Sequence, residues 1–319
     1  MTQSHKAPEL VLGTMTFGVQ TDEMAACRIV ERFLEQGFRE IDTAHFYGDG
    51  KTEEILGRMI TPALRKQIFL ATKANPWGED GLQPQAVRRQ LETSLKRLQT
   101  DSVDLFYLHA PDRNTPIEIT LEACQELFSE GRFRELGLSN YASWQVIDIW
   151  HICKKNGWVL PTAYQGMYNG ITRTVEAELF PALRSAGIRF YAYNPLAGGL
   201  LTGKYADLRN IPQTGRFAVL AMYQDRYWKQ AYFDAVDSIR ELCAGQGIKL
   251  PDSALRWELF HSMLSRQQRD TLIIGASNLQ QLKDNLAGVQ QGPLPAEIVD
   301  AYEHAWRLAR PDCPDYFRN

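Results

Sequence analysis

Ile68-Phe-Leu-Ala-Thr-Lys73 is a nearly continuous apolar run that ends in a lysine. After a polar turn, residues 84–98 repeat apolar side chains at helical spacing, from Val87 to Leu98, behind a proline in the first turn. Val103-Asp-Leu-Phe-Tyr-Leu-His109 is a second apolar run, and it ends in a histidine. This order predicts a strand, an amphipathic helix and a second strand, both strands being covered on two faces.

The same unit recurs on both sides of this stretch. Strictly alternating strands and helices predict a parallel sheet, and eight such units predict an α/β fold of the (β/α)8 barrel type. An open doubly wound sheet is the alternative, and it is disfavoured because no GxGxxG follows the first strand. The expected strands are residues 11–15, 38–42, 68–73, 103–109, 135–139, 162–165, 189–194 and 271–275. The expected helices are residues 52–59, 84–98, 117–130, 231–244 and 252–263, with others beginning at 143, 174 and 278.

Length and composition set the outer limits. A barrel takes about 250 residues, so roughly 70 of the 319 residues are surplus. No linker divides the chain, and residues 1–319 are expected to form one domain. Its surplus is expected between residues 195 and 233, where it separates the seventh strand from its helix at 231–244, and from about residue 295 to the end. A net charge of −3 gives no global reason to bind nucleic acid or anionic membranes. No apolar stretch is long enough to span a bilayer, and residues 1–8 lack the apolar core of a signal peptide.

The five cysteines are odd in number and form no CxxC pair. We therefore expect them to be reduced and mostly buried, in a cytoplasmic protein. No pair of histidines has the context of metal ligands, so no metal site is expected.

Chemistry is expected at the carboxyl ends of the strands, where barrels carry their active sites. Asp42, Lys73 and His109 end consecutive strands, and Tyr47 follows in the first of these loops. His45 of the same loop is interpreted as a packing residue. The remaining polar residues at strand ends are Ser139, Asn140, Gln165, Asn194 and Ser277.

Asp42, Tyr47, Lys73 and His109 together indicate proton donation to a carbonyl oxygen. A tyrosine pKa near 10 is too high for easy proton exchange at neutral pH, and a neighbouring ammonium lowers it. Lys73 needs Asp42 as a partner to stay charged in a closed site. His109 would hold the substrate oxygen by a hydrogen bond. An alternative is a Schiff-base lyase with Lys73 as the nucleophile, although pairing with Asp42 would keep that lysine protonated.

Longer motifs add a resemblance. Asp42-Thr-Ala-His-Phe-Tyr47-Gly48 resembles the signature of the aldo-keto reductases, and Lys73 and His109 complete that family's catalytic tetrad. Other segments resemble the family's aflatoxin aldehyde reductase (succinic semialdehyde reductase) branch. They are residues 13–18, 106–112, 136–141, 164–169, 194–204 and 313–318.

The resemblance implies a barrel that binds NADPH/NADP+ without a Rossmann domain and reduces aldehydes such as succinic semialdehyde or aflatoxin dialdehyde. It implies hydride transfer from NADPH, proton donation by Tyr47, tuning by Lys73 and Asp42, and orientation of the carbonyl by His109. It further implies cytoplasmic detoxification by a homodimer. Some relatives of this fold are instead slow-turnover regulatory subunits that bind the nicotinamide cofactor, and an intact tetrad is compatible with that role.

Binding residues are implied in the same way. The cofactor residues are Met15, Asp42, Ser139, Asn140, Gln165, Asn194, Leu196, Gly198, Leu200, Lys204, Arg216, Ser277, Gln281 and Asn285. The substrate residues are Trp77, His109, Tyr223, Arg226 and Arg318, the arginines being suited to a substrate carboxylate. Ser277 and the residue after it also start a helix, where N–H groups and the helix dipole favour an anion.

Overall fold

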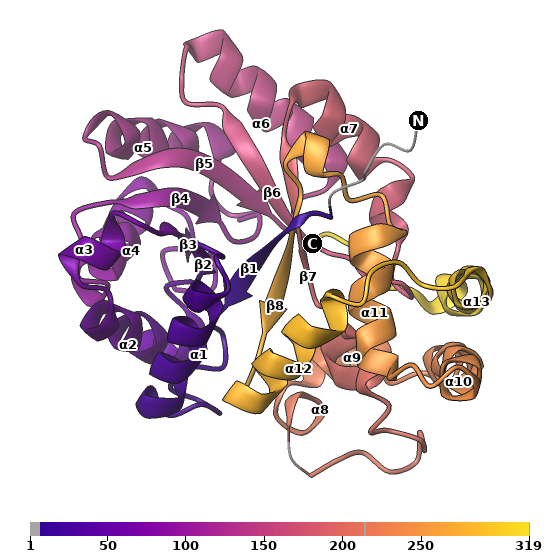
Figure 1. The fold of residues 1–319 in the computed structure, drawn as a ribbon. Coiled ribbons are helices and arrows are strands. Elements are labelled where there is room, and N and C mark those ends of the chain that lie inside the picture. The colour runs from indigo at the N-terminus through magenta and orange to yellow at the C-terminus, as the bar shows by residue number, and fades with distance from the viewer. Residues whose placement is uncertain (1–6, 214, 319) are drawn as a thin grey trace.

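The computed structural model describes residues 7–213 and 215–318, in which eight parallel strands close into a barrel in chain order (Figure 1). The barrel closes because β1 pairs with β8, with Val11 opposite Ile273. The predicted (β/α)8 fold is confirmed, and the open-sheet alternative is wrong. The strands are β1 (Glu9–Gly13), β2 (Glu40–Asp42), β3 (Phe69–Ala74), β4 (Val103–Leu108), β5 (Phe133–Ser139), β6 (Pro161–Met167), β7 (Arg189–Tyr193) and β8 (Thr271–Gly275).

The barrel interior is filled by side chains. Val11, Leu105 and Tyr191 belong to a buried cluster inside the barrel, while the opposite faces of the strands pack in the larger core. Tyr107 lies in the same inner cluster, and a Cβ atom at Gly137 would stand 2.3 Å from its ring. Burial on both faces explains why the strand sequences are continuously apolar.

Nine helices in the described residues follow the barrel connections (Figure 1). They are α1 (Glu23–Glu35), α2 (Lys51–Met59), α3 (Pro62–Arg65), α4 (Pro84–Arg97), α5 (Ile117–Ser129), α6 (Ser143–Asn156), α7 (Leu179–Ala186), α11 (Leu250–Phe260) and α12 (Leu279–Val289). The prediction that a helix begins at Thr174 is wrong. Only a short 3-10 turn forms there, and α7 begins later because Pro181 is tolerated in a first turn but not inside a helix.

The first strand ends two residues earlier than predicted. A Cβ atom at Gly13 would come within 2.8 Å of Ile273, and the chain turns immediately after that glycine. The Thr14 hydroxyl donates to the Asp42 carbonyl at 2.8 Å. Thr14 and Met15 therefore leave the strand and face the barrel mouth.

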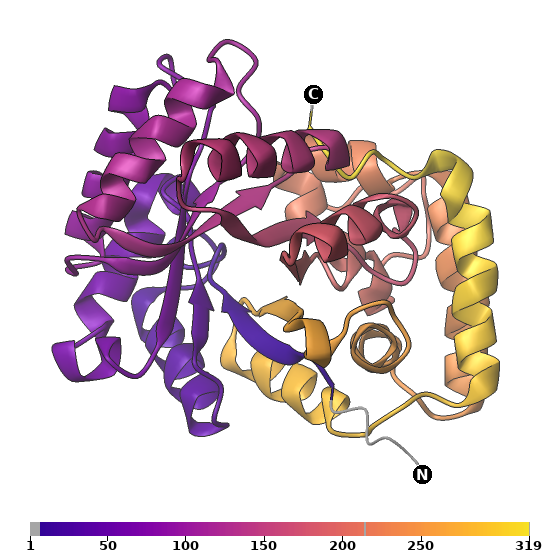
Figure 2. The same cartoon turned by 90° about the horizontal axis from the view of Figure 1, so that it is seen from above.

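The surplus residues form elements outside the barrel. After β7 come a 3-10 segment (Ala197–Thr202), α8 (Arg216–Val219), α9 (Ala221–Tyr227) and α10 (Gln230–Gly245), and α13 (Ala296–Ala309) follows α12. The predicted helix at 231–244 exists, but its assignment as the barrel helix after the seventh strand is wrong. It packs against α13 instead, and α11 takes its place beside α12 (Figure 2). The apolar faces of α10 and α13 are buried, and the two helices pack against each other. Because α10 therefore belongs to the insertion after β7, that insertion ends at residue 245 and not at 233.

The C-terminal tail returns to the barrel mouth. The Ser143 N–H donates to the Tyr316 hydroxyl at 3.0 Å, and the Arg318 N–H donates to the Asn140 carbonyl at 2.8 Å. In the part of the chain that is described, no helix has the length and apolar character needed to cross a membrane. The prediction about a signal peptide concerned residues 1–8. Residues 1–6 of that segment lie outside the described residues.

Candidate active site

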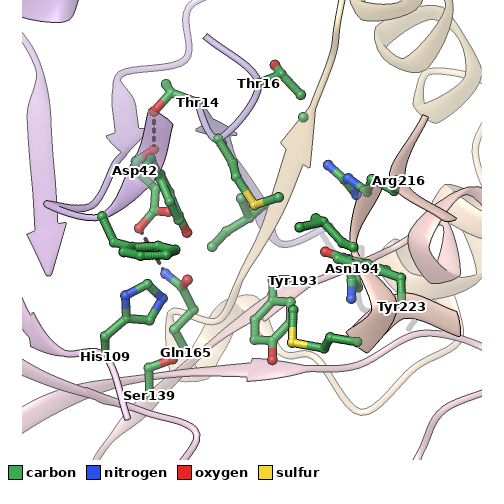
Figure 3. Close-up of a pocket in the computed structure, with 18 of the residues that line it drawn as sticks. Thr14, Thr16, Asp42, His109, Ser139, Gln165, Tyr193, Asn194, Arg216 and Tyr223 are labelled. Carbon is green, nitrogen blue, oxygen red and sulfur yellow. Dashed lines mark hydrogen bonds between the residues drawn. The ribbon is translucent and has the colours of Figure 1, made fainter. Parts of the chain in front are cut away.

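A cavity of about 610 Å³ opens at the carboxyl ends of the strands. Figure 3 shows Asp42, Gln165 and His109 on one side of it and Asn194, Tyr223 and Arg216 on the other. Most of the predicted site residues meet here. Those that line the cavity are Met15, Asp42, Tyr47, Trp77, His109, Ser139, Asn140, Gln165, Asn194, Leu196, Arg216, Tyr223, Arg226 and Arg318.

Lys73 and Asp42 form a buried ion pair beneath the cavity. The Lys73 Nζ atom lies 2.7 Å from each Asp42 carboxylate oxygen and 2.7 Å from the Thr43 carbonyl. The Lys73 side chain is 0% exposed and that of Asp42 is 4% exposed. Burial lowers the Lys73 pKa and the Asp42 charge opposes that effect. Three acceptors around Nζ are the arrangement that a buried ammonium requires.

Tyr47 stands at the start of a tight turn above this pair. Its ring centroid is 5.1 Å from the Lys73 Nζ atom and 5.9 Å from the His109 ring. Burial, followed by the Asp42 charge, raises the Tyr47 pKa well above 10. The sequence-based prediction that Lys73 lowers the Tyr47 pKa is therefore wrong for the protein without bound ligands. Burial of the phenol disfavours the charged phenolate, and this effect is the larger one. Tyr47 is a protonated donor at neutral pH.

His109 is neutral at physiological pH. Burial, and then the charges of Lys73 and Arg318, hold its pKa well below 6.5. Its ring lies 4.9 Å from the Trp77 ring, and in the described part of the chain its buried Nδ1 atom has no hydrogen-bond partner. A neutral imidazole at the cavity wall can donate or accept one hydrogen bond without introducing a charge.

Amide side chains line the next strand ends. Asn140 adopts a left-handed φ of 62° after β5, and its Nδ2 atom donates to the His109 carbonyl at 2.8 Å. The Tyr193 hydroxyl donates to the Asn140 Oδ1 atom at 2.8 Å, and Gln165 donates to Asp42 at 2.9 Å. These bonds fix the amides as a polar edge suited to a planar amide ligand.

The far wall is cationic and aromatic. Tyr223 donates to the Asn194 side chain at 3.2 Å, and the guanidinium groups of Arg216 and Arg226 lie 5.4 and 5.8 Å from the Tyr223 ring centroid. The Arg318 guanidinium group lies 5.1 Å from the Trp77 ring centroid. The cavity thus has three guanidinium groups but keeps a largely apolar lining that includes several aromatic rings, a combination suited to an anionic organic ligand.

Six predicted cofactor residues do not line this cavity. Gly198 and Leu200 are buried beneath the loop after β7, and Lys204 is exposed on it. Gln281 accepts hydrogen bonds from the N–H and hydroxyl of Ser277 at 2.9 Å at the start of α12. Asn285 reaches back to the Gly275 carbonyl at 3.5 Å. Leu200 is 0% exposed, so it presents no surface to a ligand in this structure.

Sequence reasoning missed several cavity residues. Tyr193 lies directly before Asn194 and on the same strand face as Tyr191, so its position at a strand end could have identified it. Phe46, 52% exposed, packs edge-on against Trp77 with ring centroids 5.0 Å apart. Nothing local in the sequence distinguishes Phe46 from an ordinary packing residue.

Comparisons with known proteins agree with this geometry. Residues 9–307 match the model of the aldo/keto reductase family. Human aflatoxin B1 aldehyde reductase member 2 is 52% identical, covering 97% of this chain and 89% of the relative. Human aflatoxin B1 aldehyde reductase member 4 is 50% identical, covering 98% of both chains. Human aldo-keto reductase family 7 member A3 is 49% identical over 99% of this chain and 98% of its own.

The family match spans the whole barrel, and the relatives are named as reductases. Together with a closed (β/α)8 barrel and polar side chains gathered at its mouth, this identifies the class of protein. The chain is an oxidoreductase that belongs to the aldo/keto reductase family.

Proposed function

We propose that this protein reduces aldehydes to primary alcohols with NADPH, and that Tyr47 supplies the proton. The observation that carries the proposal is the position of Tyr47, which lines the cavity 5.1 Å above the buried Lys73 ammonium and beside His109. The names of the relatives, two of which are aflatoxin B1 aldehyde reductases, support an aldehyde as the substrate.

The proton comes from the Tyr47 hydroxyl. As the carbonyl carbon is reduced, its oxygen becomes an alkoxide and takes this proton, which breaks the Tyr47 O–H bond and leaves a phenolate. With a ring centroid 5.1 Å from Nζ, the phenolate is attracted to Lys73 by roughly 3 kcal/mol at an effective dielectric near 20. Asp42 keeps Lys73 protonated for this role, and solvent returns the proton to Tyr47 afterwards.

His109 and Trp77 orient the substrate. A neutral His109 ring can donate one hydrogen bond to the aldehyde oxygen, which holds that oxygen beside the Tyr47 hydroxyl. Trp77 packs against His109 and is 41% exposed, so it forms a flat wall for the rest of the aldehyde.

The residues present fit a nicotinamide cofactor. Asn140 and Gln165 offer amide side chains at adjacent strand ends, and Asn140 donates to the Ser139 hydroxyl at 2.9 Å. When bound, NADPH supplies a hydride to the carbonyl carbon. Gly198 and Gly199 have positive φ values of 71° and 115°, a conformation that glycine favours, and the loop that they form is assigned to the cofactor pyrophosphate.

Cationic residues favour NADPH over NADH. Arg216 lines the cavity and Lys204 is exposed on the loop that precedes it, so both can approach phosphate groups. Ser277 and Gln281 lie at the N-terminal end of α12, Asn285 lies one helical turn after Gln281, and all three are assigned to the adenosine end of the cofactor. The 2′-phosphate of NADPH adds charge that such donors would bind.

A carboxylate-bearing or dicarbonyl aldehyde, such as succinic semialdehyde or aflatoxin dialdehyde, is the proposed substrate class. Arg318 and Arg226 both line the cavity, and Arg318 is held there by its own N–H bond to Asn140. A guanidinium group binds a carboxylate through two parallel hydrogen bonds.

The experiment that tests the proton donor is the Tyr47→Phe variant. NADPH oxidation on aldehyde addition should fall at least about 100-fold, since general acid catalysis contributes about that much. NADPH should still quench the intrinsic tryptophan fluorescence, which shows that the cofactor site is intact. A variant that keeps most of its turnover would refute the mechanism.

Two alternative functions each have a test of their own. Borohydride trapping of a carbonyl substrate on Lys73 would indicate a Schiff-base lyase, against which stands the enclosure of Nζ by three acceptors. Oxidation of bound NADPH in a single slow turnover, together with a stable protein partner, would indicate a regulatory subunit.

The role of Arg318 is tested by substrate comparison. Arg318→Ala should weaken an aldehyde that carries a carboxylate far more than a neutral aldehyde of similar size. Arg310→Ala, an exposed arginine earlier in the tail, is the matched control and should affect neither. Equal losses for both aldehydes in Arg318→Ala would exclude a carboxylate contact.

The assembly and location of the protein belong to the same proposal. We infer a homodimer from the resemblance to the family branch, and light scattering after size-exclusion chromatography tests it. A cytoplasmic location is supported by five cysteines that are all free, and imaging of the tagged protein in its host cell tests it.

A further inference from the structure

The loop that carries Tyr47 has an unusual backbone. After Tyr47, the φ angles of Gly48, Asp49 and Gly50 are 56°, 51° and 91°, so three consecutive residues are left-handed. This conformation is unfavourable for a non-glycine residue and persists only where surrounding contacts hold it. Hydrogen bonds within the loop are short-range, such as that from the Tyr47 N–H to the Ala44 carbonyl at 3.1 Å, and the start of the loop is tied to β3 by the His45 N–H, which donates to the Lys73 carbonyl at 3.2 Å.

Three side chains from outside the loop bond to it: Lys73 donates to the Thr43 carbonyl, Ser94 lies 3.3 Å from His45 Nδ1, and Arg97, the last residue of α4, makes two contacts. Its Nη1 atom lies 3.1 Å from the His45 carbonyl and 3.3 Å from the His45 Nδ1 atom. A Cβ atom at Gly50 would stand 2.2 Å from the guanidinium carbon, so the glycine leaves room for Arg97 against the backbone. His45, interpreted from sequence as a packing residue, is thus the acceptor for this arginine.

Arg97 is in turn held by Glu53 of α2. The Glu53 side chain is 0% exposed, and its Oε2 atom lies 3.3 Å from Arg97 Nη1. Its Oε1 atom accepts a 2.7 Å hydrogen bond from the Thr72 hydroxyl. Thr72 directly precedes Lys73, whose carbonyl accepts the His45 N–H at 3.2 Å. The contacts form a closed circuit that joins the strand of Lys73 to the loop of Tyr47.

We propose that Glu53 and Arg97 are positioning residues that hold loop residues 43–50, and with them the Tyr47 hydroxyl, in register with Lys73. The inference rests on the proposed role of Tyr47 as proton donor. Neither residue lines the cavity, so they act through the loop. A displacement of about 1 Å at a reacting group can cost about 100-fold in rate, which is why a partly buried charge pair outside the cavity matters for turnover.

The test compares Arg97→Met with Arg88→Met. Arg88 lies on the same helix and pairs with Glu126 on the surface at 3.0 Å, with its own side chain 32% exposed. Arg97→Met should lower the single-turnover rate of aldehyde reduction about 30- to 100-fold. The half-saturating aldehyde concentration should change less than about threefold, because ground-state binding is untouched. Arg88→Met should leave both unchanged.

A second readout needs no cofactor or substrate. In the protein alone, amide hydrogen exchange of a peptide spanning residues 43–50 should be at least about tenfold faster in Arg97→Met, while the barrel strands keep their protection. Arg97→Lys, which keeps the charge, should recover part of both the rate and the protection. If Arg97→Met does not fold, the same two measurements on Arg97→Lys decide the proposal.

Two results would overturn the inference. One is that Arg97→Met keeps both its single-turnover rate and the amide exchange of residues 43–50 within about twofold of the wild-type values. The other is acceleration of exchange throughout the barrel, which indicates general destabilisation. If the unchanged protein oxidises NADPH with no aldehyde, the proposed function fails, and the exchange of residues 43–50 in the protein alone still decides whether Arg97 positions the loop.

Discussion

Replacing Asp42 by Asn removes the counter-charge of a lysine that has no access to water. At 2.7 Å the pair attracts by about 6 kcal/mol at an effective dielectric near 20, an amount offset by the several kcal/mol that each ion costs to desolvate. The net contribution of the intact pair is therefore small, whereas an ammonium left without its partner costs about 3–5 kcal/mol. We expect Asp42→Asn to reduce the free energy of unfolding by about that amount.

The partner substitution behaves differently. In Lys73→Met, Asp42 keeps the hydrogen bond from Gln165 at 2.9 Å, so we expect a smaller loss. The double variant Asp42→Asn/Lys73→Met leaves no buried charge, and its cost should fall short of the sum of the single costs by about 2 kcal/mol or more. Urea unfolding followed by tryptophan fluorescence and circular dichroism measures all four proteins.

The dependence on pH supplies a second check with a definite sign. In Asp42→Asn the folded pKa of Lys73 falls further below its unfolded value of 10.5, because burial lowers it and the opposing carboxylate charge is gone. The unfolded state then binds more protons, so stability rises as the pH rises toward 10.5. The cost of Asp42→Asn should be largest near pH 7 and smaller at about pH 9.5. A loss below about 1 kcal/mol near pH 7, or one that grows with pH, would refute the reasoning.

Three further predictions concern the barrel and its site. Burial raises the Glu40 pKa from 4.5 to about 7 despite the hydrogen bond from Tyr191, so this group's stabilisation is complete below pH 4.5 and is lost as the pH rises through 7, a change of roughly 3 kcal/mol. Urea unfolding across that range should show the change, and Glu40→Gln should abolish it; an identical pH dependence in the variant would contradict the assignment. Because the His109 pKa is held well below 6.5, the pH profile of kcat/KM should show no inflection from this residue between about pH 6 and 8; an inflection there that disappears in His109→Gln would be the opposing result. Gly137→Ala places a Cβ atom 2.3 Å from the Tyr107 ring and should cost about 1–3 kcal/mol in thermal unfolding, whereas an unchanged midpoint would mean that the ring moves aside freely.

The elements and the strand-end residues were predictable because they depend on local pattern. A run such as residues 68–73 is apolar because both of its faces are covered, and its final lysine must lie where the strand leaves the barrel. Once eight such units are counted, the closed barrel brings Asp42, Lys73 and His109 to one edge. The order of the side chains along the chain was sufficient for this step.

Contacts between distant segments were not predictable in this way. Residues 231–244 have the apolar spacing of a barrel helix, and nothing within them indicates that α13 covers their apolar face. Phe46 became a cavity residue through its contact with Trp77, which comes from a different loop. Arg97 ends an ordinary amphipathic helix, yet its guanidinium group reaches a loop some fifty residues earlier in the chain.

The sequence alone thus determined the barrel, the strand ends that carry Asp42, Lys73 and His109, and the loop that carries Tyr47, because a period of alternating strands and helices has few ways to close. The tertiary structure decided which helix covers the barrel after β7, what holds the Tyr47 loop, and the direction of the Tyr47 pKa. These properties depend on how much water the folded chain excludes and on which charges it brings within a few ångströms of each other, and neither quantity exists before the chain is folded.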